Sequence, residues 1–298
     1  GSHTVEKLLA EGCRVVGVDN FRTGRHENLS HARQSTSFQL IETDVSAEGT
    51  LDKIVSEVSP AAIIHLAALV SVPESIENPD LNYRLNLHTT QLVAGAAQRH
   101  RVPRIVFASS AAVYGNSTAF PLAESQYTFP ISPYGAAKLA SESLLLGHAA
   151  AFGSRVRCQR FFNVYGPRQD PSSPYSGVIS LFLKNFRAGN PVTVFGDGLN
   201  TRDFISVTDV ARANALAALR DDITSGVTNI CTGQPLSLRR ILEIFSTHFP
   251  AAPAAIFAAP RPGDIVHSCG NAQRAQSELG FTAEIPIEAG LTELIRAS

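Results

Sequence analysis

The stretch RIVFAS at residues 104–109 decides the fold class of this chain. It is a short, mostly apolar run, which is typical of a strand buried on both faces of a parallel sheet. Further strands are expected at residues 14–19, 38–42, 62–66 and 156–161. Helices are expected at residues 4–11, 49–57, 81–99 and 132–151. Strands that alternate with crossover helices predict an α/β fold with a doubly wound parallel sheet.

The pattern becomes less regular after about residue 165. Proline and glycine interrupt the chain at residues 166–167, 196–198 and 260–263, which indicates turns rather than long crossover helices. One more helix is expected at residues 207–219. This half of the chain predicts a smaller α/β lobe over the carboxyl edge of the sheet, where open α/β sheets bind their ligands.

The composition argues against several classes of partner. The 298 residues include 25 basic and 26 acidic side chains, and the arginines are scattered, so we expect no nucleic-acid partner. The most apolar window, residues 61–72, is too short to span a bilayer, and no stretch resembles a signal peptide. We therefore expect a soluble, cytoplasmic protein with no membrane partner.

Four cysteines lie far apart in the sequence, with no C-x-x-C pair and no metal-ligand spacing to histidine. They are Cys13, Cys158, Cys231 and Cys269. A disulfide framework or a structural zinc site would need clustered ligands. We expect free, buried thiols and no metal.

Asp19 ends the first expected strand and lies eighteen residues after Gly1. A Rossmann fingerprint has glycines before a helix and an acidic residue about twenty residues further on, which binds the adenosine ribose. In this interpretation Gly1 is the last glycine of the fingerprint, and the first strand and glycine loop precede the sequence. The alternative is that residues 1–3 are a cloning remnant, which the spacing to Asp19 disfavours.

A division into two domains follows from these patterns. Residues 1–165 are expected to form a Rossmann-type domain that binds a dinucleotide, and residues 204–232 are expected to return to it. Residues 166–203 and 233–298 are expected to form the smaller lobe.

Tyr134 and Lys138 are four residues apart in an expected helix and therefore lie on one face of it. An ammonium beside a phenol favours the phenolate, so we expect Lys138 to lower the pKa of Tyr134 and make it a base near neutral pH. Ser110, directly after the strand at residues 104–109, can hydrogen-bond the same substrate oxygen. A Y-x-x-x-K pair alone also fits a surface pair, but its place after the fourth strand indicates a catalytic set.

Further motifs occur in order along the whole chain. They are GSHT at 1–4, VDN at 18–20, IHLAA at 64–68, SSAAVYG at 109–115, SPYGAAK at 132–138, RFFNVYG at 160–166, GDG at 196–198, TRDF at 201–204 and RPGD at 261–264. This set resembles the extended short-chain dehydrogenase/reductases, and within them the nucleotide-sugar 4-epimerases. The resemblance extends from residue 1 to about residue 295.

The resemblance implies NAD as the cofactor. Asp19 would repel the 2′-phosphate of NADP, whose usual site has a small residue and a nearby arginine. The residues implied at NAD are Gly1, Asp19, Asn20, Asp44, Val45, Leu66, Ala67, Ala68, Asn86, Tyr134, Lys138 and Phe162. The chain departs from many relatives at Val70, where they carry a lysine.

The resemblance also implies a UDP-sugar substrate, for which residues 166–203 and 233–298 would form the nucleotide-sugar-binding lobe. Asn163, Arg202 and Arg261 match contacts to the diphosphate, and guanidinium groups suit that anion. Phe195 matches a contact to the base, and Asp264 matches a contact to the ribose. The remaining implied substrate residues are Ser110 and Tyr134 at the sugar 4-hydroxyl, and Ser268 at the substituent on C2.

The implied reaction is reversible C4 epimerisation of a UDP-hexose through a 4-keto sugar. Relatives restricted to glucose and galactose carry tyrosine at the position of Ser268, and those that accept N-acetylated sugars carry a small residue. Because serine is small, we expect UDP-GlcNAc and UDP-GalNAc as the main substrates, alongside UDP-Glc and UDP-Gal.

Three other functions compete with this prediction. A 4,6-dehydratase resembles relatives with an Asp-Glu pair where this chain has Ala111 and Ala112. A UDP-glucuronate decarboxylase would need a further cation for the substrate carboxylate, which the sequence does not identify. A dinucleotide-sensing module would have no need of the base at Tyr134.

Two of the expected helices, residues 81–99 and 132–151, are long and rich in alanine. In the family that the chain resembles, the equivalent helices of two subunits pack as a four-helix bundle. A homodimer is therefore expected. The alternative is that the apolar faces of these helices only cover the sheet.

Overall fold

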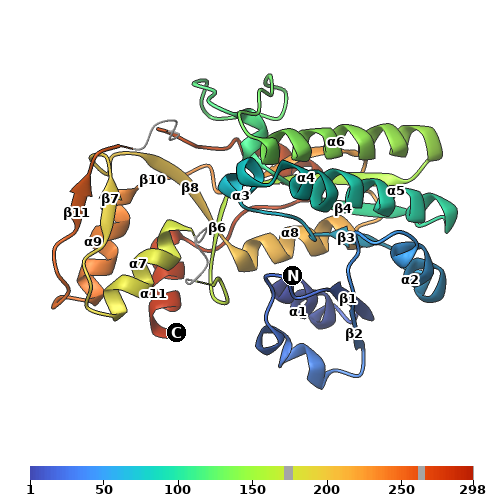
Figure 1. Ribbon diagram of the computed structural model, residues 1–298, viewed down its shortest axis with the longest axis horizontal. Helices are drawn as coiled ribbons and strands as arrows, with labels where there is room; N and C mark the ends of the chain where they lie inside the picture. The colour runs from blue at the N-terminus through green and yellow to red at the C-terminus, as the bar shows by residue number, and fades with distance from the viewer. Residues whose placement is uncertain (171–176, 261–265, 298) are drawn as a thin grey trace.

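The computed structural model describes residues 1–170, 177–260 and 266–297, which form a mixed α/β fold (Figure 1). The main sheet is parallel and has the strand order β3-β4-β5-β9. Its strands are β3 (Ile63–His65), β4 (Arg104–Ser110), β5 (Arg155–Phe161) and β9 (Gly226–Ile230). The predicted α/β class with a parallel sheet is therefore confirmed.

A second parallel pair, β1 (Val15–Asp19) and β2 (Phe38–Glu42), lies below the main sheet in Figure 1. Within the described ranges, the two sheets share no hydrogen-bonded strand pair. Helix α1 (Ser2–Ala10) lies beside this pair and packs against α8 (Val207–Leu219). The pair is thus joined to the rest of the fold through helix packing.

Helices cover both faces of the main sheet (Figure 1). Neighbouring residues of β4 point to opposite faces, as the pleat of a strand requires. Phe107 belongs to the apolar cluster that includes Val93 and Leu145, whereas Val106 belongs to the cluster that includes Val210. The helices on the first face are α2 (Thr50–Val58), α5 (Thr89–Arg99) and α6 (Pro133–Phe152), and α8 lies on the second.

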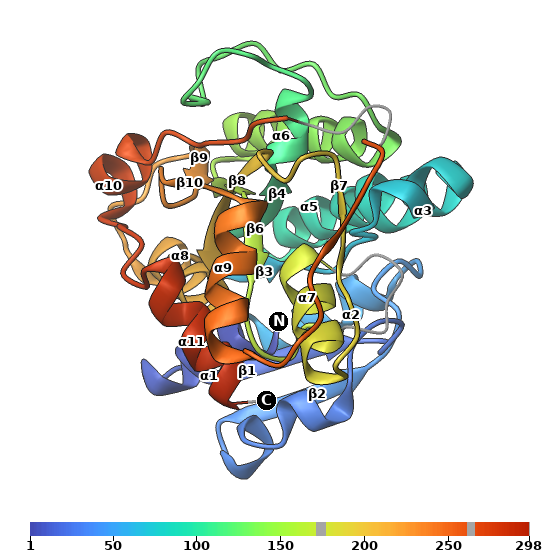
Figure 2. The same ribbon diagram turned by 90° about the vertical axis from the view of Figure 1, so that its left-hand side faces the viewer.

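The smaller lobe follows directly on β5. Its first sheet has the order β10-β8-β6 and consists of β6 (Asn163–Tyr165), β8 (Thr201–Ser206) and β10 (Pro235–Ser237). A parallel pair joins β7 (Thr193–Phe195) to β11 (Ile256–Ala258). Helices α7 (Val178–Arg187), α9 (Leu238–His248) and α11 (Ile287–Ala297) lie side by side in Figure 2 over an aromatic core.

The buried carboxylate of Asp203 joins three segments of the chain. It accepts hydrogen bonds from the backbone N–H groups of Thr232, Gly233 and Gly270, at 2.9, 2.9 and 3.1 Å, and from the Thr232 hydroxyl at 2.6 Å. Burial raises the pKa of Asp203, and these donors oppose that effect. The end of β9 and the segment around Gly270 are thereby fixed to β8.

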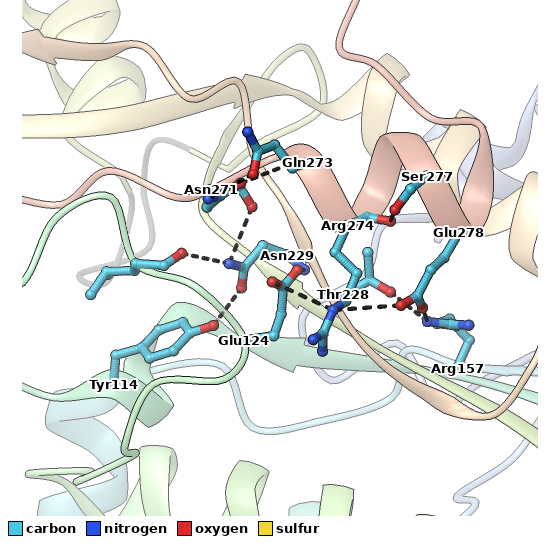
Figure 3. A network of polar contacts seen from close by, with 11 residues as sticks. Tyr114, Glu124, Arg157, Thr228, Asn229, Asn271, Gln273, Arg274, Ser277 and Glu278 are labelled. Atoms are coloured by element: carbon cyan, nitrogen blue, oxygen red, sulfur yellow. Dashed lines mark hydrogen bonds and ion pairs between the residues drawn. The ribbon is translucent and has the colours of Figure 1, made fainter.

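A second polar network surrounds Asn229 of β9 (Figure 3). The Tyr114 hydroxyl donates to its Oδ1 at 2.7 Å, and its Nδ2 donates to the Leu122 carbonyl at 2.8 Å. Its backbone N–H donates to the Glu124 carboxylate at 2.7 Å. The network holds the long loop between β4 and α6 against the main sheet, close to α10 (Gln273–Leu279).

The helix expected at residues 81–99 is present, but it contains a wider turn that was not predicted. The structure has α4 (Pro79–Asn82), a π-helical turn at Tyr83–His88 and then α5. The hydroxyls of Thr89 and Thr90 donate to the carbonyls of Arg84 and Asn86, which satisfies backbone groups near the wider turn. Helix α3 (Val72–Glu77), which precedes α4, was not predicted either.

The described residues include no helix with the length and apolar character needed to cross a bilayer.

Candidate active site

The N-terminus of α6 is fixed by contacts from three directions. Ser132 caps it, because its hydroxyl accepts a hydrogen bond from the Gly135 N–H at 3.1 Å. The Ser75 hydroxyl accepts from the backbone N–H of Tyr134 at 3.2 Å. A Cβ at Gly135 would lie 2.8 Å from the Ala112 carbonyl oxygen, so glycine permits this close approach. The position of Tyr134 in the first turn is thereby set.

The structure brings Ser110, Tyr134 and Lys138 together at the carboxyl end of β4. Ser110 is the last residue of that strand, and its hydroxyl hydrogen-bonds the Tyr134 side chain. The Lys138 Nζ lies 5.9 Å from the centroid of the Tyr134 ring and donates to the Ala108 carbonyl at 2.8 Å. All three residues of the predicted catalytic set therefore belong to one cluster.

Burial dominates the ionisation of this cluster. It raises the pKa of Tyr134, and the hydrogen bond with Ser110 acts in the opposite direction. Burial also lowers the pKa of Lys138 to about 7, although the negative charge of Glu142 acts to raise it. The expectation of a net lowering of the pKa of Tyr134 is not met in this structure, in which burial prevails.

Residues predicted at the adenosine end of NAD lie where β1 and β2 end. Asp19 is exposed, and its carboxylate accepts a hydrogen bond from the Phe21 N–H at 2.8 Å. Asn20 follows it and hydrogen-bonds Asp44, which with Val45 lies just beyond β2. Carboxylate and amide groups therefore line this edge, where a ribose could be bound through its hydroxyls.

Two arginines close to Asp19 in the sequence are paired with carboxylates. Arg22 forms an ion pair with Glu74. Arg25 forms one with Asp170, at 2.7 Å. A 2′-phosphate would meet the charge of Asp19 and would have to compete for these guanidinium groups. This arrangement fits NAD rather than NADP.

The loop at residues 66–68 follows β3, and Asn86 binds the residue directly after it. The buried Asn86 side chain accepts a hydrogen bond from the Leu69 N–H at 3.1 Å and donates to the Leu69 carbonyl at 3.0 Å. It also donates to Asn82 at 2.7 Å. Both ends of the amide are thus occupied, so Asn86 fixes Leu69, the residue directly after this loop.

Gly1 and Phe162 are the remaining residues that are predicted to bind NAD. Gly1 precedes α1 as its N-cap. A helix N-terminus suits a phosphate group. Phe162 is buried between β5 and β6. Together with the acid at position 19, these features fit NAD.

Predicted diphosphate contacts come from adjoining strands of the lobe. Asn163 lies in β6 and Arg202 lies in β8, and these strands pair in parallel. The Asn163 amide donates to the Asp203 carbonyl at 3.2 Å, and Arg202 donates to the Thr201 carbonyl at 2.9 Å. Phe195, the predicted base contact, ends β7.

Ser268 is buried, and its backbone N–H donates to the Thr201 carbonyl at 3.1 Å. This bond places it beside the strand that carries Arg202. The predicted residues Arg261 and Asp264 lie outside the described residues.

The described part of the chain contains no group of three or more His, Cys, Asp or Glu side chains that could hold a metal ion. All four cysteines are free. Cys158 and Cys231 are buried as expected, whereas Cys13 and Cys269 are only partly buried.

A Ser-Tyr-Lys set at the carboxyl edge of a doubly wound sheet defines a short-chain dehydrogenase/reductase site. The chain belongs to the NAD dependent epimerase/dehydratase family, whose sequence model matches residues 1–231. The predicted resemblance and the choice of NAD are confirmed at the level of this family.

Individual proteins similar to the chain are 4-epimerases by name. The UDP-glucose 4-epimerase of Mycolicibacterium smegmatis is 34% identical over 297 residues, which cover 99% of this chain and 94% of that protein. The structure of the Thermotoga maritima UDP-glucose 4-epimerase with UDP-glucose matches at a TM-score of 0.93 and 32% identity, covering 99% of this chain and 94% of that one.

A third similar protein acts on an N-acetylated sugar by name. The UDP-N-acetylglucosamine 4-epimerase of Methanobrevibacter ruminantium, solved with UDP-N-acetylmuramic acid, matches at a TM-score of 0.93 and 33% identity. The match covers 99% of this chain and 93% of that one. These similarities confirm the Rossmann-type fold.

Replacing Asp19 tests the adenosine end of the site. A hydrogen bond to a charged group contributes roughly 1.5–3 kcal/mol, so Asp19→Asn should weaken NAD binding about 10- to 100-fold. It should also narrow the preference for NAD over NADP, because the repelling charge is gone. Calorimetric titration of cofactor-stripped protein with both dinucleotides measures this. Asp197→Asn, at an exposed acid of the lobe, is the control. Unchanged NAD affinity in Asp19→Asn would contradict the assignment.

Proposed function

We propose that the chain catalyses the reversible C4 epimerisation of a UDP-hexose through a transient 4-keto sugar, with NAD retained. The cluster of Ser110, Tyr134 and Lys138 at the carboxyl end of β4 is the observation that carries this proposal. Membership of the NAD dependent epimerase/dehydratase family supports it. The names of the three similar proteins described above support a 4-epimerase in particular.

The residues of the cluster divide the proton chemistry among them. The Tyr134 oxygen takes the proton of the sugar 4-hydroxyl and returns it when the hydroxyl forms again on the other face. The Ser110 hydroxyl hydrogen-bonds the same sugar oxygen and keeps it close to Tyr134. The Lys138 ammonium, 5.9 Å from the centroid of the Tyr134 ring, favours the phenolate by its charge and so opposes the effect of burial. NAD, when bound, supplies the hydride acceptor and donor.

The competing functions have less support from this site. Elimination by a dehydratase would need an acid and a base after Ser110, and Ala111 and Ala112 begin the short helix there. A decarboxylase would need an additional cation at the substrate carboxylate, and the motifs of the chain supply none. A sensing module would have no need of a buried lysine whose pKa lies near 7 beside a tyrosine.

Replacement of Tyr134 tests the proposed base. Tyr134→Phe removes only the ionisable oxygen, so the fold should persist while turnover falls roughly 10²–10⁴-fold. Ser110→Ala should lose less, because water can take the place of the hydroxyl. Coupled assays of UDP-hexose interconversion, with circular dichroism as the folding control, measure both variants. Near-normal epimerisation by folded Tyr134→Phe would show that the base lies elsewhere.

We further propose UDP-GlcNAc and UDP-GalNAc as the preferred substrate pair. Ser268 is a small buried residue beside β8, and a short side chain there leaves room for an acetamido group on C2. The N-acetyl sugar in the name of the Methanobrevibacter ruminantium enzyme is consistent with this. UDP-Glc and UDP-Gal would fit the same space with fewer contacts.

A bulky side chain at this position should change the substrate range. Ser268→Tyr should abolish turnover of the N-acetylated pair and leave turnover of UDP-Glc and UDP-Gal largely intact, because the clash is confined to the C2 substituent. Ser268→Ala, which keeps the space, is the matched control. Comparison of kcat/KM on both substrate pairs is the measurement. Equal losses on both pairs, or a wild type inactive on UDP-GlcNAc, would remove Ser268 as the determinant.

We propose a homodimer formed through α5 and α6, which lie side by side in Figure 1. Helix α6 has 20 residues, and its only Asp, Glu, Lys or Arg residues, Lys138 and Glu142, are both buried. Its exposed positions include Ala136, Ser143 and Gly147. A surface helix normally carries charges on its outer face, so an uncharged outer face indicates a contact surface.

A charge on that face should separate the subunits. Light scattering should give twice the chain mass of 31.8 kDa for the wild type and one chain mass for Gly147→Glu. A Cβ at position 147 has no neighbour within 4 Å, so the variant should fold. Ala10→Glu, at an exposed position of α1, is the control and should remain dimeric. A monomeric wild type would refute the dimer.

The free cysteines suit a reducing compartment. We therefore propose a cytoplasmic location.

A further inference from the structure

Glu142 is a buried carboxylate on α6 that the catalytic set does not use. It is only 2% exposed and lies one helical turn after Lys138. Arg160 of β5 binds it with two hydrogen bonds, from Nε at 2.9 Å and from the terminal nitrogen at 2.7 Å. The Ser109 hydroxyl is a third donor to the same carboxylate. A carboxylate with these donors is held in one position.

Residues 108–110, at the end of β4, each bond to a different residue of α6. The Ala108 carbonyl accepts a hydrogen bond from Lys138, and the Ser109 hydroxyl donates one to Glu142. The Ser110 hydroxyl hydrogen-bonds Tyr134. Tyr134, Lys138 and Glu142 are spaced by four, so they form one row along the helix. The strand end and the helix therefore have a single register, and Glu142 anchors the far end of the row.

We propose that Glu142, held by Arg160, is a positioning residue of the proposed epimerase: it fixes α6 on the end of β4 and supplies the counter-charge of the Lys138 ammonium. The inference rests on the proposed function for its catalytic meaning and extends it to a residue behind the catalytic set. Glu142 touches neither the substrate nor NAD in this scheme. It acts through Lys138.

Further buried residues contact the Glu142–Arg160 pair. The Arg160 guanidinium lies 4.8 Å over the ring of Tyr114. The Tyr114 hydroxyl donates to Asn229, in the network of Figure 3. Arg160 is only 4% exposed. The pair is therefore held by buried, hydrogen-bonded groups and cannot turn toward solvent.

Glu142 is the source of negative charge among the titratable groups near the row of Tyr134, Lys138 and Glu142. The other groups are His65 on β3, Tyr114 after β4, Tyr134 on α6, and Cys158 and Arg160 on β5. Burial lowers the pKa of His65 to about 3 and raises the pKa of Tyr114 and Cys158, so all three are neutral near pH 7. Of these groups, only Glu142 acts to raise the pKa of Lys138.

A lysine titration measures this effect without an activity assay. The chain has only four lysines, so a protein labelled with ¹³C at the lysine ε-carbon gives four NMR signals, and Lys138→Arg assigns the relevant one. The wild-type midpoint of Lys138 is expected near 7. Glu142→Gln keeps the shape of the side chain and removes its charge. Its Lys138 midpoint should fall by about one pH unit, as expected for the loss of one nearby opposite charge.

The lower pKa of Lys138 in Glu142→Gln should also lower the rate at alkaline pH. A midpoint one pH unit lower leaves about one tenth as much protonated Lys138 on the alkaline side. The kcat of Glu142→Gln should therefore fall about tenfold at alkaline pH, with KM little changed. The alkaline limb of its pH–rate profile should move to lower pH. A merely structural role would lower activity at every pH without moving the limb.

Two further variants complete the test. Glu278→Gln removes the carboxylate partner of Arg157, another buried arginine of β5 (Figure 3), and should leave the Lys138 midpoint unchanged. If Glu142→Gln does not fold, Glu142→Gln/Arg160→Gln replaces the ion pair by two neutral amides. The double variant also removes the positive charge of Arg160, so its Lys138 midpoint should fall by less than that of Glu142→Gln. An unchanged midpoint in either folded variant would overturn the inference.

The proposed function and this inference can fail separately. A wild type that interconverts no UDP-hexose would contradict the proposed function, while a lowered Lys138 midpoint in Glu142→Gln would still support the counter-charge. An active wild type whose midpoint does not respond to Glu142→Gln would contradict the inference alone.

Discussion

The contact between α6 and the end of β4 is the constraint on which the site depends. Gly135 lets the helix approach the chain that leaves β4, and Ser132 caps its first turn. That approach places Tyr134 beside Ser110 and leaves Lys138 against a backbone carbonyl. Any change that lifted the helix by one ångström would separate the residues whose proximity the chemistry requires.

The lobe depends on a different buried group. Asp203 joins β8 to the end of β9 and to the segment around Gly270, and it does so with four hydrogen bonds. The same strand carries Arg202 and accepts a backbone bond from Ser268. Arg202 and Ser268 therefore lie on or beside one anchored strand, which itself pairs with β6, the strand that carries Asn163.

Periodicity and motif spacing predict much of this structure. The strand at Phe38–Glu42 and the helix at Val207–Leu219 have the predicted bounds, since each has a clear apolar pattern. The three-residue strands β7 and β11 were not predicted, because so short a segment has no period to detect. Burial, which decides the pKa of Tyr134, is a tertiary property that the spacing of two residues does not contain. Glu142 could have been found by extending the spacing of four beyond Lys138.

The central claim is that the chain inverts C4 of a UDP-hexose without releasing a redox product. The most direct measurement uses UDP-GlcNAc carrying deuterium at C4 and follows the product by NMR. If the account is right, the deuterium appears at C4 of UDP-GalNAc and none enters the solvent, because the atom that leaves C4 returns to the other face. Loss of the label to water, or accumulation of a reduced dinucleotide in step with substrate consumption, would contradict it.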